Sequence, residues 1–113
     1  MTMNESPIYT RTYDLLLWLL PHTVNFPRAY RFTIGERVAR QALDFHAKLI
    51  AAGIQTGTER LTLLRQADVE LSQLRHILRL CKDLRLFSLP QYEHAAGLLV
   101  QIGKLLGGWQ KKA

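Results

Sequence analysis

The sequence predicts an all-α fold, an up-down-up-down bundle of four helices. Apolar residues recur at intervals of three and four along four long segments, which is the spacing of a helix with one buried face. Glycine and proline residues separate these segments, and no alternation of apolar and polar residues continues long enough for a strand. Because the connections are short, consecutive helices are expected to be antiparallel neighbours.

The first helix is expected to start near Thr10 or Thr12, whose hydroxyls suit an N-cap position. Its apolar block runs from Leu15 to Leu20. Pro21 follows, and proline lacks the backbone N–H that a helix interior uses, so the helix should kink or end there.

The second helix is expected to open at Phe26, Pro27 and Arg28, because proline is well tolerated in a first helical turn. Gly53 provides its end. The residues expected on its buried face are Phe32, Gly35, Val38, Ala39, Ala42, Phe45, Leu49 and Ile50.

After a turn at Gly53 to Gly57, Thr58 is expected to cap a third helix that runs to Phe87. A helix with two apolar stripes contacts more than one neighbour. The first stripe consists of Leu64, Ala67, Leu71, Leu74, Leu78 and Cys81, and the second of Leu63, Ile77, Leu80, Leu84 and Phe87. As the single cysteine, Cys81 cannot form an intrachain disulfide and is expected to pack as a small apolar side chain.

The fourth helix is expected to start around Pro90, because Ser88 and Gln91 have the spacing of a capping box. Gly107 and Gly108 should end it. Its expected buried face consists of Tyr92, Ala95, Ala96, Leu99, Ile102, Gly103 and Leu106.

A chain of 113 residues suffices for one domain with one hydrophobic core. Residues 1–8 are expected to form a flexible lead-in, residues 9–110 the bundle and residues 111–113 a basic tail. The longest apolar run, Leu15 to Leu20, has six residues, whereas a membrane span needs about 20. No signal peptide precedes that run, so a soluble, cytoplasmic protein without a membrane partner is predicted.

The polar residues predict neither a catalytic site nor a metal site nor a cofactor. No two of the four histidines, His22, His46, His76 and His94, have the i,i+4 spacing of helix-borne metal ligands. Asp68 and Glu70 lie two residues apart on a helix, so the two carboxylates do not face one another. The sequence therefore favours a protein that binds partners over an enzyme.

Basic residues exceed acidic ones by 15 to 9, which gives a formal net charge of +6. Eight of the basic residues form two clusters along the chain: Arg28, Arg31, Arg37 and Arg40, and then Arg75, Arg79, Lys82 and Arg85. The spacing of residues 75, 79 and 82 places three cations on one helical face. These clusters are either solvated helix faces or surfaces that dock phosphates or a protein, and the surplus charge favours docking.

The apolar block Leu15 to Leu20 is wider than the stripe that a helix needs in a lone four-helix bundle, about three positions in seven. Either the first helix is fully buried within the monomer, or another chain covers the excess. The second interpretation predicts a homo-oligomer.

Five runs of the sequence are recognisable: Tyr13 to Leu20, Asn25 to Arg37, Leu74 to Leu84, Tyr92 with Glu93, and Ile102 to Trp109. They resemble Avd, the accessory variability determinant of diversity-generating retroelements. The resemblance extends from about Tyr9 to Trp109, and the stretch from Phe26 to Gly35 and the ending Gly107, Gly108 and Trp109 are its most specific parts.

The resemblance implies a four-helix bundle that assembles into a pentameric, barrel-like ring with a positively charged surface. It also implies binding to the retroelement's reverse transcriptase and to nucleic acid, with RNA as the main ligand and DNA as a further one. In such elements the transcriptase copies a template-repeat RNA with mutations at adenines, and the cDNA replaces a variable repeat in a target gene. Four-helix proteins encoded in intervening sequences of ribosomal RNA genes resemble the chain too. They are the alternative: a ring-forming protein that binds RNA or acts only as a scaffold.

Overall fold

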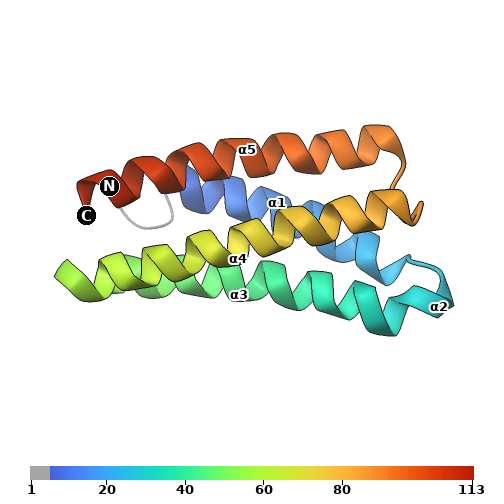
Figure 1. Cartoon of the computed structure of the whole chain (residues 1–113), viewed down its shortest axis with the longest axis horizontal. Coiled ribbons are helices and arrows are strands. Elements are labelled where there is room, and N and C mark those ends of the chain that lie inside the picture. Colours follow the sequence, from blue (N-terminus) through green and yellow to red (C-terminus); the bar gives the residue numbers. More distant parts are fainter. Residues whose placement is uncertain (1–5) are drawn as a thin grey trace.

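The computed structural model describes residues 6–113 and is all-helical in that part of the chain (Figure 1). Four long helices lie antiparallel in a bundle that measures 44 × 23 × 20 Å. They are α1 (Pro7–Val24), α3 (Glu36–Ile54), α4 (Gly57–Asp83) and α5 (Leu89–Lys112), and the short α2 (Arg28–Tyr30) and the π-helical η2 (Arg31–Gly35) lead into α3. The predicted four-helix bundle is therefore confirmed.

Helix α1 begins earlier than the sequence predicted. Ser6 is the residue before its first turn, and Pro7 occupies that turn, so Thr10 and Thr12 lie inside the helix and are not its caps. Ile8 is buried, and the Tyr9 hydroxyl donates a hydrogen bond to the Leu49 carbonyl at 2.6 Å. Residues 7 and 8, expected in the lead-in, thus belong to the bundle, and residues 1–5 lie outside the described residues.

Pro21 does not end α1, which continues to Val24. The carbonyl that loses its helical partner is that of Leu17, a residue on the solvent-facing side of the helix. Water can therefore satisfy that carbonyl. One turn further, the Thr23 hydroxyl donates to the Leu20 carbonyl at 2.8 Å, and this bond supports the last turn.

The second long helix is not regular along its whole length, because the π-helical turn Arg31–Gly35 interrupts it. Gly35 lies against the end of α1: a Cβ there would be 3.2 Å from the Thr23 carbonyl oxygen and 3.4 Å from the Phe26 ring. Glycine therefore allows the two helices to approach closely. Phe32, expected on the buried face, lies within the π turn and is 64% exposed. The wider turn takes its side chain off the α-helical period on which the expectation depended.

Helix α4 starts at Gly57 and ends at Asp83, so Thr58 is not its cap and Phe87 is not part of it. The first predicted stripe of α4, from Leu64 to Cys81, is completely buried, as expected. Phe87 is buried too, but it lies in the turn after α4. Its ring packs against that of Phe26, with 5.3 Å between the two ring centres. Its apolar character therefore reflects closure of the bundle end and not continuation of the helix.

Helix α5 begins with the predicted capping box: the Gln91 backbone N–H donates to the Ser88 hydroxyl at 3.2 Å, and the Ser88 N–H donates to the Gln91 side chain at 2.9 Å. Gly107 and Gly108 do not end the helix, which continues to Lys112 through most of the expected tail. Beyond them, the Trp109 ring packs edge-on against Tyr9 at 6.1 Å. This tertiary contact compensates for the low helix propensity of the two glycines.

Candidate interaction surfaces

Both arginine clusters lie toward the end of the bundle that carries α2 and the turn between α4 and α5 (Figure 1). Gln41 fixes the register of α3 and α4, because its side-chain amide donates to the Glu70 carbonyl at 3.3 Å and to the Gln73 side chain at 3.1 Å. Arg37 lies one turn before Gln41. Since the helices are antiparallel, it lies at the level of Arg75 and the following turn of α4.

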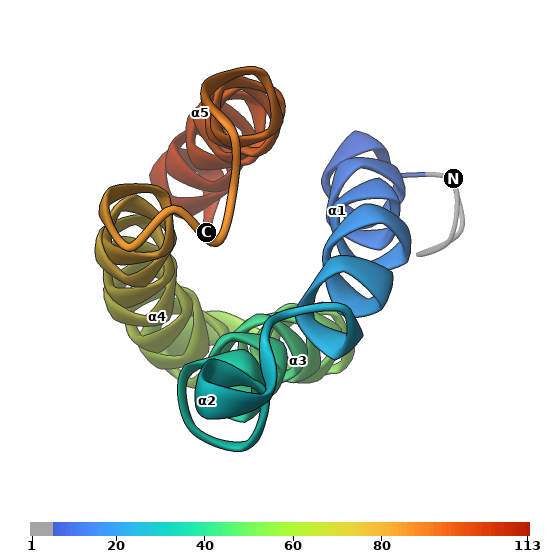
Figure 2. The ribbon, with the colours of Figure 1, turned by 90° about the vertical axis from the view of Figure 1, so that its right-hand side faces the viewer.

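Arg37 of the first cluster and Arg75 and Lys82 of the second lie on different flanks of neighbouring helices. Arg37 shares the α4-facing flank of α3 with Gln41, four residues away. Arg75 and Lys82 lie on the α5-facing flank of α4, where the Arg75 guanidinium lies beside Gly103 and the Lys82 ammonium lies 4.9 Å from the Tyr92 ring centre. The end view shows α3, α4 and α5 as successive neighbours around the bundle (Figure 2). The outward face of α4 therefore separates Arg37 from Arg75 and Lys82.

Seven of the eight predicted cations are exposed, and Lys82 is partly buried. Within residues 6–113 only Lys82 of the eight forms an ion pair, with Asp83 at 3.6 Å. Arg31 donates to the Phe26 carbonyl at 3.3 Å, and its guanidinium lies 6.0 Å from the Phe32 ring centre. Arg85, expected on a helix, lies in the turn after α4 with a φ of 62°. Most of this positive charge is thus not neutralised by acidic neighbours.

Several exposed apolar side chains lie on the outward face of α1 and α3. Tyr13, Leu17 and Val24 share one face of α1, and Leu17 is 60% exposed. Leu43 and Ile50 of α3 are exposed as well, although Ile50 was expected to be buried. These five residues constitute the α1–α3 apolar face. The first helix is therefore not fully buried within the monomer, as one of the two interpretations expected, and cover by another chain stays a prediction.

A second uncovered apolar face lies on α4, diagonally across the bundle from α1 (Figure 2). Val69, Ile77 and Leu80 form it, and Leu80 is 46% exposed. Together with Gln73 and His76 they line a shallow hollow on the surface of this helix. We call it the α4 apolar face.

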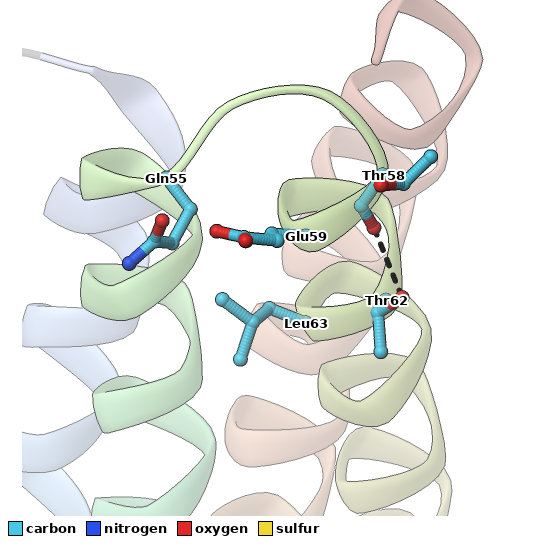
Figure 3. Close-up of a pocket in the computed structure, with 5 residues that line it drawn as sticks. All are labelled: Gln55, Thr58, Glu59, Thr62 and Leu63. Atoms are coloured by element: carbon cyan, nitrogen blue, oxygen red, sulfur yellow. Dashed lines mark hydrogen bonds between the residues drawn. The ribbon is translucent and has the colours of Figure 1, made fainter.

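Another hollow lies at the turn between α3 and α4, away from both arginine clusters (Figure 3). Its lining includes one carboxylate, Glu59, and the hydroxyl of Thr62, which donates to the Thr58 carbonyl at 2.9 Å. Among residues 6–113, no three histidine, cysteine or acidic side chains are grouped so that they could hold a metal ion.

Burial shifts the pKa of two side chains, the buried Cys81 and the partly buried His46. Burial raises the pKa of the Cys81 thiol to about 11, so this side chain stays protonated and packs as an apolar group. Burial also lowers the pKa of His46, whose Nδ1 has no hydrogen-bond partner among the described residues.

Among residues 6–113, no helix has the length and the apolar character that crossing a membrane would require.

The fold and these surfaces define a small four-helix-bundle protein with arginine-rich flanks and two uncovered apolar faces. Residues 7–113 match the model of the bAvd-like family, so the chain belongs to that family. The resemblance to Avd is thereby confirmed. None of the curated proteins compared with the chain matches it.

Proposed function

We propose that this chain is a non-catalytic, cytoplasmic accessory protein of a diversity-generating retroelement. It binds the reverse transcriptase and nucleic acid, the template-repeat RNA or its cDNA, and thereby supports mutagenic reverse transcription. The observation that carries the proposal is the match to the bAvd-like family over residues 7–113. The exposed arginines without acidic partners support the nucleic-acid part of it.

The row of Arg75, Arg79 and Lys82 suits a polyanion better than a single small anion. From the first to the last of these residues the helix rises by about 10 Å, whereas successive phosphates of a duplex strand are separated by about 3.4 Å along the axis. The row can therefore contact more than one phosphate. Such contacts release counterions, so binding should weaken steeply as the salt concentration rises.

The test compares two triple variants with the same loss of charge. In the first, Arg75, Arg79 and Lys82 become alanine; in the second, Lys104, Lys111 and Lys112 of α5 become alanine. The proposal expects the first variant to lose RNA retention and co-purification with the reverse transcriptase of the same element, and the second to keep most of both. If both variants behaved like the parent protein, these three α4 residues would have no part in docking.

For the assembly we propose a homopentameric ring. A closed ring requires two different, complementary faces on each subunit, because every contact joins one face of a copy to the other face of the next copy. The α1–α3 apolar face and the α4 apolar face are two such different faces, since they lie on different helices and α4 is diagonally opposite α1. Sedimentation should then give the mass of five copies of the 13.0 kDa chain.

Two charge substitutions test this arrangement. Leu17→Asp places a charge in the α1–α3 apolar face, and Leu80→Asp places one in the α4 apolar face. Because a charge in an apolar contact disfavours association, each variant alone should remain a monomer. Mixed together, the two variants still offer one intact face each and should form a 1:1 dimer that cannot grow. If Leu80→Asp alone formed a dimer, the α1–α3 face would pair with itself and the ring arrangement would be wrong.

A scaffold of the ribosomal RNA intervening-sequence type is the second candidate, and the two apolar faces favour it equally. It would form the same oligomer but would not need the reverse transcriptase. An oligomer that binds neither RNA nor DNA at low salt would favour the scaffold. A reverse-transcriptase gene and a pair of near-repeats beside the gene for this chain would favour the retroelement.

A further inference from the structure

Arg75 of α4 occupies space that a side chain on α5 would otherwise fill. At Gly103, a Cβ would overlap the Nη2 nitrogen of Arg75 and would lie 3.6 Å from its Cζ atom and 3.8 Å from the Leu71 side chain. Any residue other than glycine at position 103 would therefore displace the guanidinium.

The backbone gives no reason for glycine at this position. Gly103 lies inside α5 and does not have a positive φ, and in such a position alanine is the better helix former. Gly97, Gly107 and Gly108 lie in the same helix, and a Cβ at any of these three would meet nothing within 4 Å. Among the glycines of α5, only Gly103 has its missing side chain replaced by another group.

No acidic partner explains the position of the guanidinium either, because Arg75 forms no ion pair within the described part of the chain. The guanidinium of the exposed Arg75 thus lies beside Gly103 without a neutralising partner among those residues. Lys82, seven residues further along the same flank, also contacts α5: its ammonium lies 4.9 Å from the ring centre of Tyr92, although it pairs with Asp83 as well. Ordering before binding reduces the entropy that a side chain loses when it contacts a ligand.

We propose that Gly103 is a positioning residue for nucleic-acid binding. By leaving space on α5, it fixes the Arg75 guanidinium at the seam between α4 and α5, in line with Arg79 and Lys82, where it contacts a backbone phosphate. This inference rests on the proposed function and adds to it a residue that carries no charge.

The test is Gly103→Ala with Gly107→Ala as the matched control. Binding to a synthetic single-stranded RNA of mixed sequence is measured by fluorescence anisotropy over a range of salt concentrations. Gly103→Ala is expected to bind more weakly and to lower the salt slope by about 0.7, the value of one phosphate contact on a single strand. Gly107→Ala should bind like the parent protein. Thermal unfolding should show both variants at least as stable as the parent, because alanine favours the helix.

A double-mutant cycle shows whether Gly103 acts through Arg75. Arg75→Ala should lose as much binding as Gly103→Ala, and the double variant should lose no more than Arg75→Ala alone. Arg75→Lys leaves Gly103 untouched, so it tests the geometry even if Gly103→Ala folds poorly. It keeps the charge without the planar guanidinium, and its binding should lie between those of Arg75→Ala and the parent.

Unchanged binding by Gly103→Ala, or losses that add up in the double variant, would overturn the inference while leaving the proposed function intact. Binding by Arg75→Lys equal to that of the parent would also overturn it. If the parent protein did not bind RNA at low salt, the nucleic-acid part of the proposed function would be overturned, and the inference with it.

Discussion

An arginine stands at the end of α4 where helices usually have glycine. The Arg85 N–H donates to the Lys82 carbonyl at 2.9 Å and the Leu86 N–H to the Cys81 carbonyl at 2.8 Å, which is the hydrogen-bond pattern of a Schellman motif. Arg85 has a φ of 62°, the left-handed conformation that this motif requires. For a residue with a Cβ that conformation costs about 1–2 kcal/mol, and glycine avoids the cost.

Arg85→Gly should therefore stabilise the protein. Glycine loses about 0.4–1 kcal/mol more backbone entropy on folding, so the net gain in unfolding free energy should be about 0.5–1 kcal/mol. For a chain of this size that corresponds to a rise in Tm of about 2–6 °C. Arg85→Ala is the control, because it removes the same side chain and keeps the left-handed conformation.

The assay is thermal and urea unfolding followed by circular dichroism. All variants are compared at one protein concentration, because the Tm of an oligomer depends on concentration. If Arg85→Gly were no more stable than Arg85→Ala, the left-handed conformation would carry no cost and the reasoning would be refuted. Both variants remove one cation of the second cluster, so both should bind RNA more weakly by the same factor.

Three further predictions concern the core, a helix cap and a buried thiol. Phe45→Ala should lower the unfolding free energy by about 3–5 kcal/mol, measured in urea, since Phe45 is completely buried; a loss below 1 kcal/mol would contradict this. Ser88→Ala should cost about 1 kcal/mol through the lost cap, whereas exposed Ser72→Ala should change little; equal losses would speak against the cap. The native Cys81 thiol, with a pKa of about 11, keeps its proton where the unfolded thiol, with a pKa of 9.0, releases it. Urea stability should therefore fall as the pH rises from about 9 to 11, and Cys81→Ala should remove that part of the fall.

The parts of the fold that depend on local signals could be predicted from the sequence. The buried stripe of α4 follows from helical spacing alone, and the cap of α5 follows from Ser88 and Gln91. Errors arose where tertiary contacts override local preference: α5 continues through Gly107 and Gly108 because Trp109 packs on Tyr9. The π turn before α3 had no signal in the spacing of apolar residues.

The surfaces were predictable only in part. That the eight cations lie outside the core follows from their charge. The neighbouring helix that a flank faces does not, because it depends on contacts between helices such as those of Gln41 with α4 and of Arg75 with Gly103. The excess width of the leucine block was visible in the sequence, but which of its residues is exposed, Leu17, was not. Ile50 fits the buried period of its helix, so its exposure could be recognised only once α1 and α3 had been placed side by side.

The π turn at Arg31–Gly35 holds one residue more than an α-helical turn. In a regular helix each residue rotates the chain by about 100°, so one extra residue would redirect all the side chains on one side of it. The wider π turn takes up the extra residue locally instead. Deleting a single codon within this turn should therefore restore a regular helix and leave Arg28 on the same flank relative to Arg37 and Arg40. A π turn thus lets a chain gain or lose one residue over evolutionary time while its binding surface keeps its direction.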